Sequence, residues 1–87
     1  MNLNLNIFDN DVACLLLSSN ISILEFKTVK SDDNKVFFNF NLDEEHYKTA
    51  IDLIEKYEVG EVQIDLRKYN YNRRMLLKKI TKIKNAQ

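Results

Sequence analysis

Four short segments of this chain each have one apolar side at a period of two, the pattern of strands that bury one side of a sheet, and 3–7 and 62–66 alternate strictly. The four segments lie at 3–7, 21–30, 35–41 and 62–66. The run 31–34 is dense in turn-forming residues and predicts a hairpin between the second and third segments. The apolar sides of the four segments are Leu3/Leu5/Ile7, Leu24/Phe26, Val36/Phe38/Phe40 and Val62/Ile64/Leu66. Four strands of this kind favour one sheet that is covered on its apolar face.

Two stretches between these segments predict helices. The run 9–11 (Asp-Asn-Asp) can cap a helix over 12–19, although the apolar run 12–17 is short enough to be a strand instead. A cap-like start at 41–44, with Glu44 three residues after Asn41, opens the second stretch. There an apolar stripe faces a charged side, and Gly60 suits the end of the helix. The stripe consists of Tyr47, Ala50, Ile51, Ile54 and Tyr57.

With 12–19 helical, the order of elements is β-α-β-β-α-β, followed by a C-terminal amphipathic helix. This order predicts an α+β fold of the ferredoxin-like type with its helices on one face. If 12–17 is a strand, the alternative is an antiparallel β-meander with one covering helix. A chain of 87 residues supports one modest core, so we expect a single domain made of an acidic part, 1–66, and a basic helical part, 67–87.

Part of the chain resembles the middle of ACT-type regulatory domains. The resemblance rests on Asn20–Ile23, which leads into the hairpin, and on Leu42–Glu45, which opens a helix. It covers residues 3–66 and implies the ferredoxin-like fold. It also implies one functional alternative, a small-molecule regulatory domain with a pocket near residues 8–12. Those domains usually have a glycine-containing turn there, whereas this chain has the run 9–11.

The charges of the chain are divided along its length. Residues 1–66 contain all thirteen acidic residues and five lysines, a net charge of −8. Residues 67–87 contain eight lysines and arginines and no acid, a net charge of +8. A charge asymmetry of this kind concerns the choice of partner more than the fold.

The basic segment predicts an amphipathic helix over 73–84, with the apolar stripe Leu76, Leu77, Ile80 and Ile83 opposite lysines and arginines. Such a helix can bind an acidic protein or the phosphates of a nucleic acid, and tyrosines beside it can stack on unpaired bases. Membrane binding is not expected, because the segment lacks Trp and Phe. The candidate contact residues are Arg67, Lys68, Arg73, Arg74, Lys78, Lys79, Lys82, Lys84, Tyr69 and Tyr71.

Other residues give weaker functional signals. His46 lies at a helix start beside acidic residues and is interpreted as a solvated side chain. Cys14 lies in an apolar run without basic neighbours, which indicates a buried, unreactive thiol. The aspartates of 9–11 and 32–33 have turn rather than calcium-loop spacing, and the phenylalanines of 37–40 are better explained by core packing than by base stacking. We therefore predict no catalytic, cofactor or metal site.

The sequence favours a small non-enzymatic protein-interaction module. An adaptor, or an inhibitor of the phage type that occupies a partner's surface, would have this character, and self-association of acidic and basic surfaces as a homodimer is a further option. The first alternative is a nucleic-acid-binding protein that uses the segment 67–84, and the second is the ACT-like regulatory domain. One cysteine and no signal-peptide pattern predict a cytoplasmic location.

Overall fold

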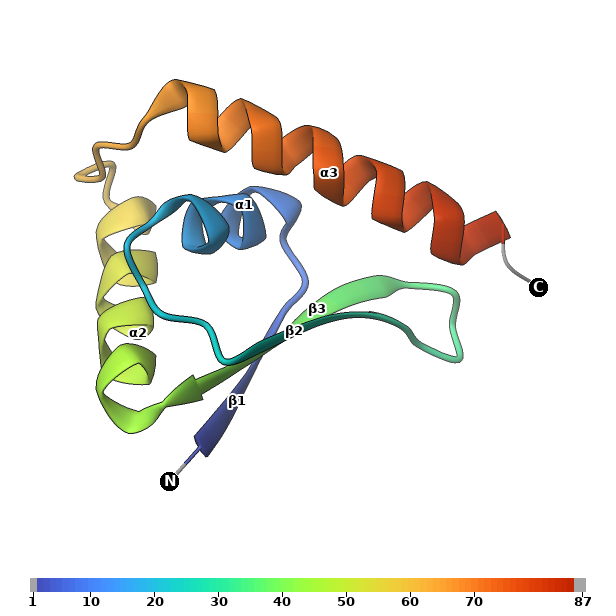
Figure 1. Cartoon of the computed structure of the whole chain (residues 1–87), viewed down its shortest axis with the longest axis horizontal. Helices are drawn as coiled ribbons and strands as arrows, with labels where there is room; N and C mark the ends of the chain where they lie inside the picture. Colours follow the sequence, from blue (N-terminus) through green and yellow to red (C-terminus); the bar gives the residue numbers. More distant parts are fainter. Residues whose placement is uncertain (1, 86–87) are drawn as a thin grey trace.

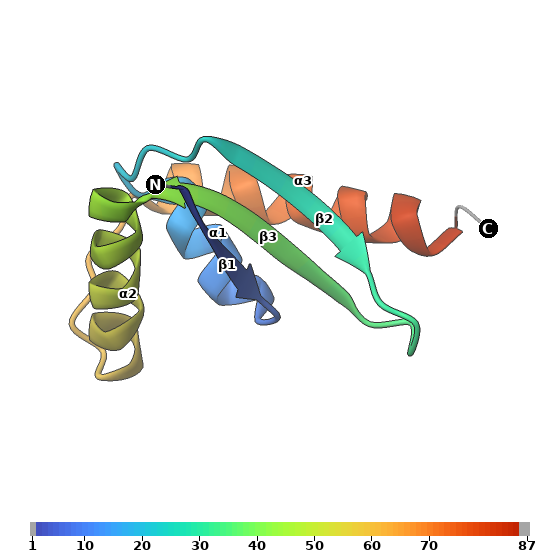
Figure 2. The same cartoon turned by 90° about the horizontal axis from the view of Figure 1, so that it is seen from below.

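Three strands form one antiparallel sheet in which the last of them lies in the centre. The computed structural model describes residues 2–85, and the sheet order is β1-β3-β2 (Figure 2). The elements in chain order are β1 (Asn2–Ile7), α1 (Asn10–Ser18), β2 (Glu25–Lys30), β3 (Val36–Asp43), α2 (Glu44–Glu58) and α3 (Leu66–Asn85). The α+β class is confirmed, and the meander alternative is wrong because residues 12–17 belong to α1.

The helix α1 lies between the sheet and α3, in the middle of the molecule (Figure 1). It begins as predicted at the aspartate-rich run, where Asp9 Oδ1 accepts hydrogen bonds from the N–H groups of Asp11 (2.8 Å) and Val12 (3.4 Å). Six of its nine residues are buried. A helix that is apolar nearly all round needs neighbours on both sides, and the sheet and α3 provide them.

The core lies on one side of the sheet. Phe38 and Phe40 of β3 are fully buried there and pack with residues of all three helices. Phe26 of β2 adds aromatic contacts, with ring centroids 5.8 Å from Phe38 and 5.0 Å from Phe40. The opposite side of the sheet carries the polar members of each strand, including Asn6 and Asn39, whose side-chain amides bond to each other at 2.8 Å. The predicted one-sided covering of the sheet is therefore confirmed.

The fourth predicted strand, 62–66, is absent from the described residues. Residues 61–65 form an irregular linker, and α3 begins at Leu66. Val62 and Ile64 are half-buried and line one hollow with Leu15 and Leu53, without pairing with a strand. The ferredoxin-like β-α-β-β-α-β order is therefore incomplete, and α3 follows where the prediction had a fourth strand.

Two smaller boundaries also differ from the prediction. β2 begins at Glu25 rather than at residue 21, and Leu24 is 52% exposed instead of facing the core. β3 continues through Asp43, and Asp43 rather than Asn41 caps α2 by accepting the N–H of His46 at 2.8 Å. Pairing with β1 explains the extension, because Asn41 lies opposite Asn4 in the ladder.

Candidate partner-binding surface

The basic helix α3 starts at a well-defined cap. Gly60 has a φ of 76° and ends the turn after α2, which suits a residue without a Cβ. Five residues later, Asp65 Oδ1 accepts hydrogen bonds from the N–H groups of Arg67 (2.9 Å) and Lys68 (3.3 Å). The carboxylate therefore satisfies two of the unpaired N–H groups of the first turn and favours helix over strand at this point.

One face of α3 holds it against α1. The Tyr69 hydroxyl donates to Asp11 Oδ1 at 3.0 Å, and Asn72 Nδ2 donates to the Ser18 hydroxyl at 3.0 Å. Leu76 is only 1% exposed. Residues 69, 72 and 76 lie on one side of a helix, so these three contacts fix the rotation of α3 about its axis.

The environment of Tyr69 confirms that this tyrosine is a structural contact. Burial first, and then the hydrogen bond to Asp11, raise the pKa of Tyr69 to about 12. Its ring packs against the core, so it does not lie with the exposed cations as the sequence prediction had placed it. Tyr71, by contrast, is 59% exposed.

The opposite face of α3 points to solvent and forms a surface that we call the basic ridge. It consists of Arg67, Tyr71, Arg74, Lys78 and Lys82. At 100° per residue, its members lie within about 80° of one another around the helix and face away from Leu76. All of them are exposed. The helix has twenty residues and is about 30 Å long, so the ridge is a straight row of charges.

The remaining cations of α3 lie on the two flanks of the ridge. Lys68 and Lys79 are on one flank, Arg73 and Lys84 on the other, and all four are exposed. Leu77 lies beside the ridge and is 45% exposed, so the predicted apolar stripe is narrower than expected. With Lys78, Thr81 and Lys82 it lines a shallow hollow of about 380 Å³.

Among residues 2–85, none of the eight predicted basic contact residues has an acidic oxygen within salt-bridge distance. The five ion pairs there lie in β2, the hairpin and α2. In α2, Lys48 and Lys56 each pair with the acid four residues before them, at 3.6 Å from Glu44 and 3.1 Å from Asp52. The structure therefore brings the basic residues together on one helix and leaves their charge uncompensated locally.

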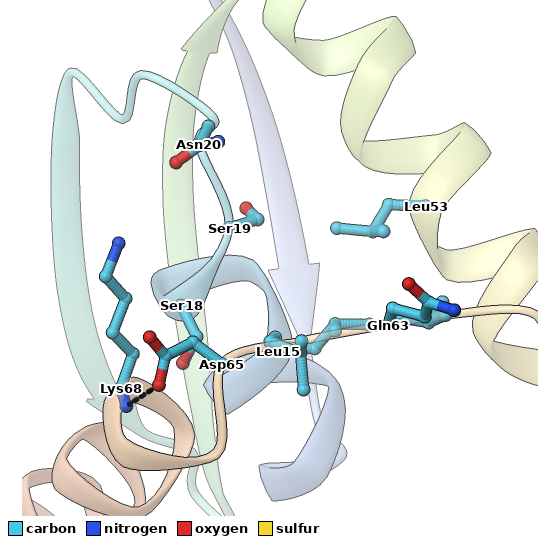
Figure 3. Close-up of a pocket in the computed structure, with 10 residues that line it drawn as sticks. Leu15, Ser18, Ser19, Asn20, Leu53, Gln63, Asp65 and Lys68 are labelled. Carbon is cyan, nitrogen blue, oxygen red and sulfur yellow. Dashed lines mark hydrogen bonds between the residues drawn. The ribbon is translucent and has the colours of Figure 1, made fainter.

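Two hollows lie beside α1. One of about 310 Å³ is lined by the end of α1, by α2 and by the linker before α3; Figure 3 shows Ser18, Asn20, Gln63 and Lys68 around it. Its one carboxylate, Asp65, already caps α3. The other, of about 300 Å³, lies at residues 9–11 and is closed by Arg73 and Leu77 of α3. It lies near residues 8–12, where the sequence resemblance predicts a pocket, and nothing in the structure identifies a ligand for it.

Cys14 is buried as the sequence indicated, whereas His46 is partly buried and bonds to Asp43 and is not the solvated side chain that the sequence predicted. Cys14 is buried, and this burial, followed by the charge of Asp11, raises the pKa of its thiol. His46 Nδ1 lies 2.9 Å from Asp43 Oδ1, and the His46 N–H that Asp43 accepts is the main reason why the pKa of Asp43 is lowered. In the described part of the chain, no three His, Cys, Asp or Glu side chains gather as metal ligands.

Sequence reasoning missed three residues that matter for this surface. The alternating pattern predicts Asp65 to lie in a strand, although an aspartate directly before a periodic helical segment is also a capping signal. Asn72 is not among the candidates, because the sequence around an asparagine on the apolar side of a helix does not indicate its hydrogen-bond partner. In the structure this partner is Ser18. Leu77 was placed in the core-facing stripe, since periodicity cannot tell the edge of a stripe from its centre.

Neither protein-family models, nor curated proteins, nor solved structures give a match to this chain. Within residues 2–85, none of the helices is long and apolar enough to cross a membrane.

Proposed function

We propose that this protein is a small non-enzymatic interaction module that binds an acidic surface of a partner protein through the basic ridge of α3. The observation that carries the proposal is the fixed orientation of α3. Tyr69, Asn72 and Leu76 hold one face against α1, so the ridge is displayed outward, and among the described residues it has no acidic partner within salt-bridge distance. Charges that are positioned and unpaired raise the association rate and the specificity for a surface of opposite charge.

Two features favour a protein partner. Leu77 is exposed between the ridge and Arg73, and mixed apolar and cationic contacts are typical of protein interfaces. Asp9, which caps α1, and Asp11 in its first turn also lie beside α3, where Asp11 holds Tyr69. A long polyanion such as a nucleic acid would be repelled there, whereas a folded acidic surface can contact the outward ridge alone.

The test uses two labelled acidic peptides of equal charge, a glutamate-rich peptide with leucines and one without. We expect the wild-type chain to bind the leucine-containing peptide more tightly than the other. We also expect its affinity for both peptides to fall as the salt concentration rises. The ridge variant Arg74→Gln/Lys78→Gln/Lys82→Gln should lose about tenfold or more in affinity. Leu77→Ser should remove the preference between the two peptides while leaving the salt dependence in place.

The matched control is Lys68→Gln/Lys79→Gln/Lys84→Gln, which removes three charges from the flanks of the same helix. It should retain most of the affinity, because the charges that it removes lie outside the basic ridge. The two variants have the same net charge and differ only in the face of α3 that loses charge. Equal losses in the ridge and flank variants would show that net charge alone governs binding, and the proposed surface would then be wrong.

A second candidate, binding of single-stranded nucleic acid, is favoured by one observation. Tyr71 is exposed on the ridge, one helical turn from Arg67 and from Arg74, so a base could stack on its ring while the arginines contact phosphates. A labelled single-stranded oligonucleotide of matched charge separates the two candidates. Tighter binding of the oligonucleotide than of either peptide, with a loss in Tyr71→Ala, would support the nucleic-acid function instead.

A further inference from the structure

The sheet has two edges that differ in what covers them. The order β1-β3-β2 leaves β1 and β2 outermost (Figure 2). β2 lies beside α3 and carries Glu25, Lys27 and Lys30. The linker 61–65 runs between α1 and α2, so within residues 2–85 no strand pairs with the outer edge of β1.

The backbone groups on this outer edge follow from the register of the sheet. The Leu24 N–H donates to the Asn41 carbonyl at 2.9 Å, which directs the backbone of Asn41 towards β2. Asn4 lies opposite Asn41, and in an antiparallel ladder such a pair makes no backbone bonds to each other. The N–H and C=O groups of Asn2, Asn4 and Asn6 therefore point away from β3, to the open edge.

β1 lacks the features that keep edge strands from pairing. Natural edges usually carry charges, prolines or bulges, whereas β1 (Asn-Leu-Asn-Leu-Asn-Ile) has no charged residue and no proline. Of the six described elements it is the one without any charge, in a chain that is 30% charged. Leu3 and Leu5 are half-buried, so part of their apolar surface remains exposed along the same edge.

We propose that β1 pairs with the β1 strand of a second copy of this chain, antiparallel about a two-fold axis. With Asn4 at the axis, Leu3 lies opposite the second copy's Leu5, and Asn2 opposite its Asn6. Apolar residues meet on the core side, asparagines meet on the polar side, and no like charges are opposed. The two three-stranded sheets become one continuous sheet, an isologous interface that leaves both basic ridges free.

The occupant is a second copy because the edge is self-complementary in pattern and charge. Self-pairing of β2 is less favourable, because its outward backbone groups belong to Phe26, Thr28 and Lys30 and α3 lies beside this strand. An axis at Thr28 would set Lys30 opposite Phe26 and Lys27 opposite Val29, so charged side chains would meet apolar ones. An acid-to-base dimer would use α2 and α3 and dissociate in high salt, whereas pairing of the neutral β1 strands is insensitive to salt. The two forms of self-association are therefore distinguishable by one measurement.

The test measures the mass of the full chain by sedimentation, from on the order of 1 μM to 1 mM, in low and high salt. We expect the mass to rise from 10.3 kDa towards twice that value in both salts. Asn4→Pro removes the outward N–H and leaves the bonds to β3, so it should stay monomeric. Asn4→Thr keeps that N–H and favours strand, and it should dimerise like the wild type.

A second variant guards against a folding defect in Asn4→Pro. Asn4→Lys keeps the N–H but opposes two positive charges at the axis, and it should also be monomeric with an unchanged circular dichroism spectrum. Amide exchange gives a direct readout, because the Asn4 amide should be protected at high concentration only, and the Leu5 amide at every concentration. A wild-type chain that is monomeric at the highest concentration overturns the proposal, as does a dimer that both variants leave intact.

Discussion

The helices α2 and α3 are both amphipathic, yet they place their charges in different ways. On α2, acidic and basic residues alternate along the exposed face, and Lys48 and Lys56 pair with acids one turn earlier. On α3, the exposed residues are basic or neutral, and in the described chain they have no acidic partner. Charges at i and i+4 contribute to helix stability when opposite and oppose it when alike.

The comparison shows which charges serve the fold. The charges on the exposed face of α2 pair with one another and stabilise the helix, so their presence is explained without an external partner. The exposed face of α3 works against its own helix, since Arg74, Lys78 and Lys82 follow one another at intervals of four residues. α3 must therefore depend on its cap and on its contacts with α1, and the acidic partner proposed above would supply the opposite charge that the described residues do not provide.

The largest effect should come from removing the apolar contact that holds α3. Leu76→Ala leaves a cavity between α3 and α1, and we expect it to lower the free energy of unfolding by about 2–5 kcal/mol. Leu77→Ala, one residue along on the exposed flank, should change it by less than about 0.5 kcal/mol. Urea unfolding of both variants measures the difference. Similar losses in the two would mean that α3 is not fixed in the described orientation.

The sequence predicts only in part which faces of the helices and the sheet are buried and which are exposed. The basic and apolar sides of α3 follow from a helical period of 3.6, and the one-sided sheet follows from a period of two, because both patterns are local. The fourth strand was predicted on the same local ground and is wrong. Val62 and Ile64 alternate as a strand would, but Asp65 caps a helix directly after them, and both residues line a hollow with Leu15 and Leu53 without joining the sheet.

Local sequence patterns do not predict contacts between residues that are far apart in the chain. The bonds from Tyr69 to Asp11 and from Asn72 to Ser18 join positions more than fifty residues apart. The sequence treats Tyr69 and Tyr71 alike, as candidate contact residues that could stack on bases, since both are aromatic residues in a basic segment. Their two-residue separation places them on different faces of a helix, and the packing of α3 on α1 determines which one is exposed.

A smaller effect should appear at the tyrosine contact, and it should depend on pH. Tyr69→Phe removes the bond to Asp11 and should cost about 0.5–1 kcal/mol near neutral pH, because one end is exposed to solvent. The folded-state pKa of about 12 is above the usual value of about 10. The contribution of Tyr69 is therefore complete below pH 10 and is lost as the pH rises through 10 towards 12.

The measurement is the difference in the free energy of unfolding between wild type and Tyr69→Phe, since subtraction removes the titration of the lysines. We expect a constant difference up to about pH 9 and a shrinking one above pH 10. A difference that stays constant between pH 9 and pH 11 would contradict the described burial and hydrogen bonding of the Tyr69 hydroxyl. This result would also weaken the argument that Tyr69 fixes the rotation of α3, and the ridge would then rest on Leu76 and Asn72.

The smallest change in stability should reveal the clearest contrast between the two helices. Lys78→Glu places an acid between Arg74 and Lys82 on the basic ridge, and each new pair should contribute about 0.2–0.5 kcal/mol. The same substitution in α2, Lys48→Glu, breaks the pair with Glu44 and adds repulsion with Asp52, so it should destabilise by a similar amount. Thermal unfolding at low salt should therefore give shifts of opposite sign.

Binding should respond in the opposite sense to stability. Lys78→Glu should weaken capture of the acidic peptides even though it stabilises the helix, whereas Lys48→Glu should leave capture nearly unchanged because α2 lies away from the ridge (Figure 1). A helix that becomes more stable when its charge row is interrupted is one whose sequence is not optimal for folding. If Lys78→Glu is destabilising instead, the row contributes to the fold itself, and the distinction between the charges of α2 and α3 no longer holds.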